Sequence, residues 1–388
     1  MKVLKLRRGA ERRTSRGHAW IFSNEIENFD STLEPGSDVT VVDYQGKPVG
    51  SGTFSPKSLI SVRLHSKKGN VPLDEGELFS RIKRAADFRS EWYGEEAKSA
   101  RLVFAEGDGL PGLVADRFED TLSVQILTAG MEKRTEAVLD ALQSLFSPKG
   151  ILLRNDSAVR ELEGLAREVK VGRGEVGELV SFTLGGLKLF ADLYGGQKTG
   201  FFFDQRENYR LLERIAGGAK VLDAFCYSGS WGLNALKYGA KEVSFADISA
   251  GALDLAAKNA EANGFANFEC IKADVLELLR EEETRYDVVV LDPPAYAKNK
   301  KSVPAALRGY LNLNKWGLRR VKPGGYLVTC SCSLNVSPDE FTEAVALAAS
   351  EAGREVRVIG VGRQAADHPW IPAMAETMYL KVLLLKVL

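Results

Sequence analysis

From Lys220 to about residue 330, the sequence alternates between short apolar runs and helical segments. Residues 221–223, 242–247, 268–272, 286–292 and 325–329 have the composition of strands, and the stretches between them have a helical period. The run 286–292 is almost continuously apolar, as expected for a strand that is buried on both faces. Strands that alternate with helices form parallel sheets covered by helices on both faces. This series therefore predicts an α/β domain with a parallel sheet.

The first 180 residues are organised differently. Residues 38–43 and 58–64 alternate between apolar and polar side chains, which predicts a small β-rich module. Residues 75–93 have a helical period, and strand-like runs and a helix at about 132–146 follow, which predicts an α+β unit. Residues 160–180 are charged and contain glycines, so we expect a connecting segment. With 388 residues, one core is not enough, and we predict domains at 1–68, 72–182 and 183–388.

Composition narrows the possible environments. The four cysteines show no paired zinc-type spacing and there are three histidines, so we expect no metal site. A disulfide framework does not fit a chain of this size, which favours a reducing cytoplasm. No apolar run approaches the roughly 20 residues that cross a bilayer, so no membrane association is predicted. The basic N-terminus lacks the apolar segment of a secretory signal.

Positive charge is concentrated in two zones, although the formal net charge is zero. Residues 1–20 carry seven basic residues and one acidic residue, a net +6, and residues 296–322 carry eight basic residues and no acid, a net +8. Such zones can be solvated helix faces, or they can contact the phosphates of a nucleic acid. On the second interpretation, the candidate RNA-binding residues are Arg7, Arg8, Arg12, Arg13, Arg16, Lys298, Lys300, Lys301 and Arg308.

Polar residues follow the predicted strands at their carboxyl ends, where ligands of such sheets bind. Asp223 precedes a glycine turn at Gly229, and Asp247, 18 residues later, ends the next strand, where a carboxylate can bind ribose hydroxyls. Asp274 follows the third strand, as either an adenine contact or a helix N-cap. Asp292 begins an Asp-Pro-Pro segment. The glycine spacing lacks the pattern of a phosphate-binding loop.

This set of residues resembles that of the class I S-adenosylmethionine-dependent methyltransferases. In them, the glycine turn holds the methionine part of the cofactor and the second-strand acid holds the ribose. The segment 195–206 fits a loop closing over the cofactor or, equally, an aromatic core with Asp204 capping a helix. The residues predicted to bind S-adenosylmethionine are Thr199, Phe203, Asp204, Arg206, Asp223, Phe225, Ser228, Gly229, Asp247, Ile248, Asp274, Val275 and Asp292.

Cys332 lies just beyond the last predicted parallel strand, and with Asp292 it forms the predicted catalytic pair. A thiolate that adds to C6 of cytosine makes C5 nucleophilic enough to accept a methyl group. Lys298, Lys300 and Lys301 are close enough in sequence to supply the positive charge that favours a thiolate. Cys332 can instead be a small buried residue. Cys330 is the competing nucleophile, whereas Cys226 and Cys270 are expected to pack in the turn and the core.

Over its whole length the chain resembles the ribosomal RNA large-subunit methyltransferase I type of cytosine-C5 methyltransferases. The segments that carry the resemblance are Gly17-His18-Ala-Trp20-Ile-Phe22, Glu106-Gly-Asp-Gly-Leu-Pro-Gly112, Lys198-Thr-Gly200, Asp204-Gln205-Arg206, Asp292-Pro-Pro, Arg308-Gly-Tyr310, Ser331-Cys332-Ser333 and Arg363-Gln-Ala-Ala-Asp-His-Pro369.

The resemblance implies an N-terminal PUA RNA-binding domain, a small central α+β domain and a C-terminal Rossmann-like methyltransferase domain with a mostly parallel seven-stranded sheet. It also implies formation of 5-methylcytosine in 23S ribosomal RNA, with Cys332 as the nucleophile. Many 5-methylcytosine RNA enzymes carry a Pro-Cys after the fourth strand. Here that place has Pro294-Ala295, which shifts the role to Cys332. His18 and Trp20 are expected to be structural.

Several alternatives stay open. Asp292-Pro-Pro-Ala-Tyr296 is similar to the signature of exocyclic-amine methyltransferases, although the aromatic residue lies one position late. The protein could also be a non-catalytic RNA-binding factor in ribosome assembly. The residues do not distinguish naked 23S RNA from an assembling large subunit as the partner, leave open a homodimer, and do not identify the base that removes the C5 proton.

Overall fold

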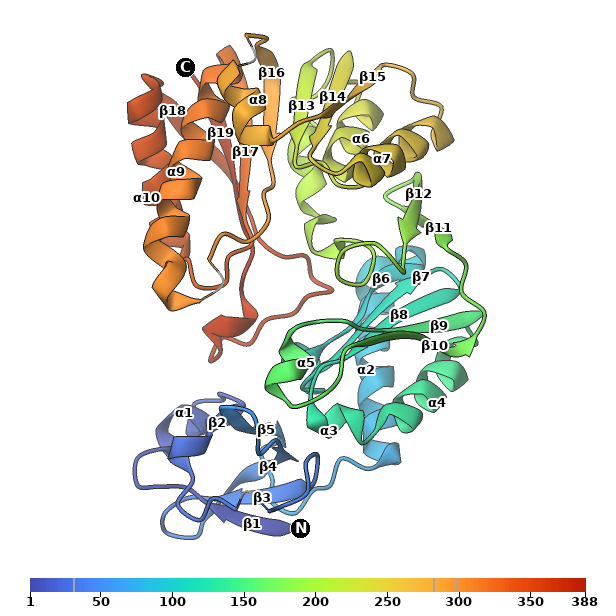
Figure 1. Cartoon of the computed structure of the whole chain (residues 1–388), viewed down its shortest axis with the longest axis vertical. Helices are drawn as coiled ribbons and strands as arrows, with labels where there is room; N and C mark the ends of the chain where they lie inside the picture. Colours follow the sequence, from blue (N-terminus) through green and yellow to red (C-terminus); the bar gives the residue numbers. More distant parts are fainter. Residues whose placement is uncertain (31, 282, 298) are drawn as a thin grey trace. The chain divides into compact units, whose positions relative to one another are not determined.

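The computed structural model describes residues 1–30, 32–281, 283–297 and 299–388. The chain forms two compact units. The first comprises Met1–Thr183, Ala191–Phe203 and Ala366–Thr377, and the second comprises Leu184–Phe190, Asp204–Ala365 and Met378–Leu388. The boundary between the units lies in the strand pair β11 (Leu179–Leu184) and β12 (Leu187–Asp192), labelled in Figure 1. The three predicted domain boundaries stay predictions.

The N-terminal part of the first unit is a five-stranded sheet in the order β1-β3-β4-β5-β2. Its elements are β1 (Lys2–Lys5), α1 (Glu11–Ser15), β2 (Trp20–Phe22), β3 (Asp38–Val42), β4 (Pro48–Phe54) and β5 (Ile60–Ser66). Apolar side chains from these strands, among them Leu4, Val39, Phe54 and Val62, form one buried cluster. The alternation in the sequence therefore does mark strands, and the predicted β-rich module is confirmed.

The rest of the first unit is a second five-stranded sheet, in the order β10-β9-β8-β7-β6, with helices packed on it (Figure 1). Its strands are β6 (Ser99–Phe104), β7 (Leu113–Phe118), β8 (Thr121–Ile126), β9 (Gly150–Asn155) and β10 (Glu168–Gly174). Its helices are α2 (Glu75–Tyr93), α3 (Ala129–Glu132), α4 (Thr135–Phe146) and α5 (Val159–Leu162). The α2 helix has the predicted bounds because Asp74 caps it, accepting a hydrogen bond from the Glu77 amide at 2.9 Å.

The second unit is built on the predicted parallel sheet. Seven strands lie in the order β15-β14-β13-β16-β17-β19-β18, and β19 runs antiparallel to both of its neighbours. The strands are β13 (Lys220–Ala224), β14 (Glu242–Asp247), β15 (Phe268–Lys272), β16 (Tyr286–Leu291), β17 (Val321–Ser331), β18 (Val356–Gly362) and β19 (Lys381–Val387). From β13, the chain adds β14 and β15 on one side of the sheet and then β16 and β17 on the other. Ligands of open parallel sheets bind at the point where this strand order reverses, here between β13 and β16.

Helices cover both faces of this sheet. They are α6 (Ser230–Lys237), α7 (Ala250–Ala262), α8 (Val275–Glu281), α9 (Val303–Arg320) and α10 (Pro338–Ala352). One face packs against α8, α9 and α10 through a cluster that includes Leu279, Tyr310 and Phe341. On the other face α6 lies very close to β14, since a Cβ at Gly232 would meet Phe245 at 2.4 Å. The strong apolar character of residues 286–291 is therefore explained by burial on both sides.

Two expectations from the sequence are wrong. The segment 160–180 is not only a connection, because Glu168–Gly174 forms β10, an edge strand paired with β9. Its charged residues, such as Lys170, suit an edge strand, because one side of the strand faces solvent. Cys270 is exposed rather than part of the core, because β15 is also an edge strand. Local sequence marks a strand but not its position in the sheet.

Three of the family-like segments meet in the first unit. Asp108 binds the fully buried Arg89 guanidinium through two contacts of 2.6 and 2.8 Å. Arg89 also donates to the carbonyl of Asp367, at 2.7 Å. Trp20 donates through its indole nitrogen to Glu106 at 2.8 Å. A Cβ at Gly107 would lie 2.2 Å from the Pro369 carbonyl oxygen, so only glycine fits there. These segments are explained by packing and ion pairing within this unit.

We predict that Asp108→Ala lowers the free energy of unfolding by about 3–5 kcal/mol, because the buried Arg89 loses its counter-charge. The shift in the urea midpoint measures this loss. Asp87→Ala, on the helix α2 that carries Arg89, is the matched control. Its exposed ion pair with Lys83 should contribute less than about 0.5 kcal/mol. Equal effects of the two substitutions would contradict the prediction.

Candidate functional site

The candidate site lies at the carboxyl edge of the seven-stranded sheet, where β13, β14, β16 and β17 end. Asp223 is the second-last residue of β13, and Asp247 is the last residue of β14. Asp292 directly follows β16, and Cys332 directly follows β17. Parallel pairing brings these ends together, since Ala224 pairs with Leu291 and Leu291 pairs with Thr329. The structure thus gathers the four predicted residues along one edge, on either side of the point where the strand order reverses.

The turn after β13 has a strained backbone. Phe225 and Tyr227 have φ angles of +62° and +47°, values that non-glycine residues rarely adopt, and Gly229 follows with +82°. A Cβ at Gly229 would lie 2.9 Å from the Cβ of Ala256 on α7. Asp247 holds the turn by accepting a hydrogen bond from the Tyr227 amide at 3.1 Å. Strain of this kind is typical of loops shaped for a ligand.

Asp223 is completely buried beneath this turn. One carboxylate oxygen accepts a hydrogen bond from the Gly232 amide at 2.8 Å, and the other has no hydrogen-bond partner among the described residues. Burial, with the nearby Asp292 and Asp247 carboxylates, raises the pKa of Asp223 to about 7. A buried acceptor without a donor is costly, so this oxygen is suited to accept a hydrogen bond from a bound ligand.

Asp292 is positioned by two donors from different segments. Its Oδ2 atom accepts hydrogen bonds from the Gln205 side chain at 2.9 Å and from the Trp231 indole at 3.0 Å. Tyr209 packs edge-on against Trp231, with ring centroids 5.1 Å apart. Gln205 is itself held by the Asn208 side chain at 2.7 Å. The acid at the start of Asp-Pro-Pro is therefore fixed by a network of buried groups.

The two thiols near β17 have different surroundings. Cys330 is fully buried, and burial together with Asp292 raises its pKa well above the usual value. Cys332 is half-buried, and its Sγ lies 3.7 Å from the carbonyl oxygen of Pro293. Since the thiolate is the nucleophilic form, the environment of Cys330 keeps that thiol protonated, whereas Cys332 lies at the open end of the strand.

Lys381 on β19 lies beside this segment, a position that no local sequence pattern indicated. The lysine pairs with Ser331 across the sheet, and its ammonium donates to the carbonyl of Ser333 at 2.6 Å and to that of Tyr379 at 2.8 Å. Burial lowers the pKa of Lys381 to about 8, while Cys332 and then Glu340 act against this decrease. Among the described residues, Lys381 forms no ion pair with a carboxylate. A buried lysine without such a partner is unusual.

The lysines that were predicted to supply positive charge to Cys332 are not buried beside it where the structure describes them. Lys300 and Lys301 are exposed in a short 3-10 helix (Lys300–Ser302), and Lys298 lies outside the described residues. The buried cation near Cys332 is instead Lys381, from a strand more than 40 residues later. Only the pairing of β17 with β19 brings it there, so local sequence could not have revealed it.

The remaining predicted cofactor residues near the edge have mixed surroundings. Asp274 caps α8, accepting from the Leu276 and Glu277 amides, so it has the structural role that the sequence allowed. Ile248 is 68% exposed, whereas Val275 and Ser228 are buried. The expected packing role of Cys226 is confirmed by its burial.

The predicted loop residues 199–206 divide between the two units. In the first unit, Thr199 donates to Asp116, and Phe203 is fully buried against the rings of Phe118, Phe182 and Phe201. This is the aromatic core that the sequence offered as one interpretation. Their cofactor contacts stay predictions.

In the second unit, Arg206 is buried and Asp204 accepts a hydrogen bond from the Tyr379 hydroxyl at 2.5 Å. Asp204 does not cap an α-helix, which corrects the prediction. The segment Phe203–Gln205 forms a short 3-10 turn, because no helical run continues from it.

Lys298 lies outside the described residues, and the other predicted RNA-binding residues are exposed except for Arg13. Arg7, Arg8, Arg12, Arg16, Lys300, Lys301 and Arg308 are exposed. Arg13 is only half-exposed because it pairs with Glu25 at 2.9 Å and lies over the Phe22 ring. Its positive charge is therefore partly neutralised within the N-terminal module.

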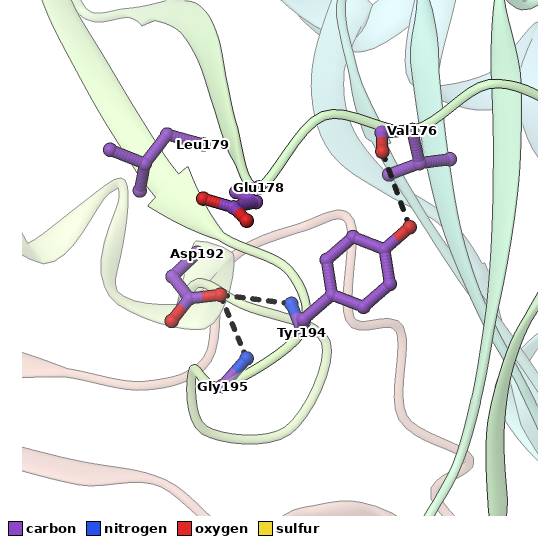
Figure 2. Close-up of a pocket in the computed structure, with 6 residues that line it drawn as sticks. All are labelled: Val176, Glu178, Leu179, Asp192, Tyr194 and Gly195. Atoms are coloured by element: carbon purple, nitrogen blue, oxygen red, sulfur yellow. Dashed lines mark hydrogen bonds between the residues drawn. The ribbon is translucent and has the colours of Figure 1, made fainter.

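A separate pocket of about 560 Å³ lies in the first unit (Figure 2). It is lined by Val176, Glu178, Leu179, Asp192, Tyr194 and Gly195. Figure 2 shows Asp192 accepting from the amides of Tyr194 and Gly195, at 2.9 and 2.7 Å. No residue of the predicted site lines this pocket.

The described part of the chain has neither a cluster of metal ligands nor a helix that could cross a membrane. Residues 1–30, 32–281, 283–297 and 299–388 contain no group of three or more histidine, cysteine or acidic side chains able to hold a metal ion. Within the same ranges, none of the helices combines the length and apolar character that crossing a bilayer requires.

Comparison with known proteins extends these observations. Residues 4–67 match the model of a PUA-like domain family, and residues 153–386 match the model of an S-adenosylmethionine-dependent methyltransferase family. A ribosomal RNA large subunit methyltransferase I from Klebsiella pneumoniae is 38% identical over 97% of this chain and 96% of its own. One of the same name from Tolumonas auensis is 39% identical over 99% and 98%.

Solved structures share the fold. A protein described as an S-adenosylmethionine-dependent methyltransferase from Streptococcus mutans is similar over 100% of both chains, with a TM-score of 0.84 and 20% identity. The protein SMU.776, crystallised in complex with S-adenosylhomocysteine (SAH), gives a TM-score of 0.86 at 20% identity and the same coverage. The N-terminal module is thus a PUA-like domain. With its match to the methyltransferase model and its nearly full-length relatives, the chain belongs to the S-adenosylmethionine-dependent family of ribosomal RNA large subunit methyltransferases I.

Proposed function

We propose that this protein methylates C5 of a cytosine in 23S ribosomal RNA through a covalent adduct with Cys332. The observation that carries the proposal is the placement of a half-buried thiol at the same sheet edge as Asp292, next to a buried lysine. The names of the full-length relatives support ribosomal RNA as the substrate. The substrate would be either the naked RNA or an assembling large subunit.

The carboxyl edge fits S-adenosylmethionine, which supplies an activated methyl group. The cofactor carries a sulfonium and an ammonium group, and the edge offers the Asp223, Asp247 and Asp292 carboxylates. The buried oxygen of Asp223 without a donor would accept a bond from the ammonium group. Asp247 would bind the ribose hydroxyls, while Gly229 lets the ligand approach the backbone closely.

The chemistry needs a thiolate because C5 of cytosine is a poor nucleophile. The Cys332 sulfur would form a bond to C6, and the electron pair of the C5–C6 double bond would then attack the methyl group. The bond between this methyl group and the sulfonium sulfur would break at the same time, with its electron pair left on the sulfur of the departing S-adenosylhomocysteine. A base then takes the proton from C5, the C5–C6 double bond re-forms, and the thiolate leaves. The Cys332 thiolate is thus regenerated at the end of the cycle.

Two neighbours would support this step. Asp292 would accept a hydrogen bond from the exocyclic amine of cytosine, since its position is fixed by Gln205 and Trp231. Lys381 would favour the thiolate, because a nearby positive charge stabilises a negative sulfur. The raised pKa of Cys330 disfavours it as the nucleophile.

The PUA-like module would bind the RNA through Arg7, Arg8, Arg12 and Arg16, which are exposed and form no ion pair with a carboxylate of the described residues. An RNA phosphate can pair with such a guanidinium through two parallel hydrogen bonds. We place the protein in the cytoplasm, where ribosomal RNA of bacteria is found. A homodimer stays a prediction from the sequence.

Methylation of an exocyclic amine is the competing chemistry. Its signature has an aromatic residue directly after the two prolines, but here Tyr296 lies one position late. The Tyr296 ring packs on that of Tyr310, with centroids 4.8 Å apart, and against the main core of the second unit. Mass spectrometry that locates the new methyl group on carbon or on nitrogen decides between the two chemistries.

We predict that Cys332→Ala reduces methyl transfer from labelled S-adenosylmethionine to unmodified 23S RNA by at least about 1,000-fold, because no adduct can form. The matched control, Cys330→Ala, should retain most of the activity. RNA that contains 5-fluorocytidine should form a stable adduct with the unmodified enzyme and with Cys330→Ala, since the fluorine blocks release. Undiminished turnover by Cys332→Ala would refute the proposed chemistry.

We predict that S-adenosylmethionine binds more weakly as the pH falls from 7.5 to 5.5. Asp223 has a raised pKa of about 7, so below this pH it is protonated and cannot pair with a cation. The affinity should decrease by up to about tenfold per pH unit below 7, measured by calorimetry, because one proton competes with the ligand. Asp223→Asn should bind weakly and without this pH dependence.

The control is Asp254→Asn, which changes an exposed carboxylate on α7 and should leave the pH dependence intact. An affinity of the unmodified protein that stays constant across this pH range would contradict the role of Asp223.

We predict that Lys381→Met lowers turnover about tenfold at pH 7, with recovery toward the original rate near pH 9, because alkali replaces the missing charge in forming the thiolate. The pH profile of the maximal rate is the measurement. Lys386→Met, on the same strand at its other end, should keep the original profile. If Lys381→Met only lowers the melting temperature and leaves the profile unmoved, Lys381 is merely structural.

A further inference from the structure

A second basic site lies at the opposite, amino edge of the seven-stranded sheet. Arg285 directly precedes β16, Arg319 and Arg320 directly precede β17, and Arg354 precedes β18 by one residue. Because β16, β17 and β18 run parallel, these segments meet at the edge away from Asp292 and Cys332. Four arginines from three separate parts of the chain thus converge at a place that the methyl-transfer chemistry does not use.

These arginines line a cavity of about 440 Å³ together with the indole ring of Trp316 and the end of α10 at Ala352 and Gly353. The Arg319 guanidinium carbon lies 4.6 Å from the centroid of the Trp316 ring. Trp316 is partly buried against the core of the unit, so its ring is held in place. The cavity therefore combines fixed positive charge with an aromatic surface.

The arginines have few partners of their own. Arg320 donates to the carbonyls of Leu279 and Arg280, and Arg354 donates to that of Val321. Arg319 makes one long bond of 3.4 Å to a backbone carbonyl. Among residues 1–30, 32–281, 283–297 and 299–388, no carboxylate pairs with any of the four. Since each guanidinium has five donors, several remain to face a ligand.

One acidic group close to the cavity already has a basic partner. The Glu351 carboxylate, at the end of α10, pairs with Lys315 at 2.9 Å. Burial, together with the charge of Arg285, lowers the pKa of Arg354. This mutual repulsion would be relieved by a bound anion. A favourable interaction with the dipole of α9 explains why Arg319 and Arg320 occupy its last turn. It does not explain why Arg285 and Arg354 are positively charged residues at the same place.

We propose that the cavity formed by Arg285, Trp316, Arg319, Arg320 and Arg354 binds phosphates of an RNA strand, with a base stacked on Trp316. Arginine matches phosphate geometry through paired hydrogen bonds, and aromatic rings stack unpaired bases without regard to sequence. The inference rests on the proposed function, because the RNA would be the same molecule whose cytosine reaches the carboxyl edge.

The distance between the two edges sets the length of RNA that can use both. The six residues of β16 span about 20 Å at roughly 3.3 Å per residue. Successive phosphates of a helical strand rise by about 3.4 Å along the helix axis, so about six nucleotides of such a strand cover this span. The cavity would therefore contact RNA that lies outside the immediate surroundings of the target base.

The test is the double variant Arg285→Gln/Arg319→Gln, which leaves in place the arginines that bind helix-end carbonyls most closely. Binding of an unmodified 23S RNA fragment of several tens of nucleotides is measured between 50 and 300 mM KCl by filter retention. Affinity should fall about tenfold. The slope of log K against log salt should become shallower by about 1.4 to 1.8, because two phosphate contacts are lost.

The control variant is Arg214→Gln, an exposed arginine elsewhere in the same unit, which should bind like the original protein. In turnover, the double variant should raise KM for long RNA with kcat unchanged, whereas an RNA shorter than about six nucleotides should show no difference. Trp316→Leu, checked for folding by its melting curve, should weaken binding with an unchanged salt slope.

An affinity and salt slope equal to those of Arg214→Gln would overturn the inference. A second outcome would also overturn it. If a free mononucleotide binds in the cavity while the double variant binds RNA as the original protein does, the ligand is a nucleotide rather than an RNA strand. RNA binding is measured without turnover, so an inactive unmodified protein would contradict the proposed function and leave this test intact.

Discussion

Close packing of negative charge at the carboxyl edge is the constraint on which the site depends. Asp223 is completely buried, and this burial, followed by the charge of the nearby Asp292 and Asp247 carboxylates, raises its pKa to about 7. Hydrogen bonds from backbone amides offset part of the cost of holding these negative charges together. The Gly232 amide donates to Asp223 and the Tyr227 amide donates to Asp247, and amides that are fixed in place lose little entropy when they bond. The edge is therefore complete only with a cation, which is a property of the bound methyl donor.

The strand order explains why one edge can serve two reactants. The strand order reverses between β13 and β16, and ligands of open parallel sheets bind at such a point, here between the glycine turn and the Asp-Pro-Pro segment. The methyl donor would lie on the β13 side and the target base on the β17 side, with Asp292 between them. The antiparallel strand β19 then brings Lys381 alongside β17, so a cation reaches the thiol without disturbing the acidic half of the edge.

Much of this organisation could be predicted from the sequence because it depends on local periodicity. The parallel strands and the acids that follow them are encoded within a few residues of each other. The position of Cys270 could not be predicted, since an edge strand and a central strand share the same propensity. Lys381 was not identified from the sequence for a related reason, because its position beside β17 depends on pairing between distant strands. The N-cap role of Asp274 was visible in the sequence but could not be separated from ligand binding.

The comparison of Cys330 with Cys332 shows what depth in a sheet does to chemistry. The two thiols are two residues apart, so an extended strand would direct both to the same face. Cys330 is still paired within the sheet, opposite Val382, and its burial raises the cost of a thiolate. Cys332 lies one residue beyond the strand, where the chain leaves the sheet and the ladder no longer covers it. A nucleophile at this point keeps the rigidity of the strand while it gains access to a substrate, so the end of β17 is the position at which a cysteine can be both oriented and reactive.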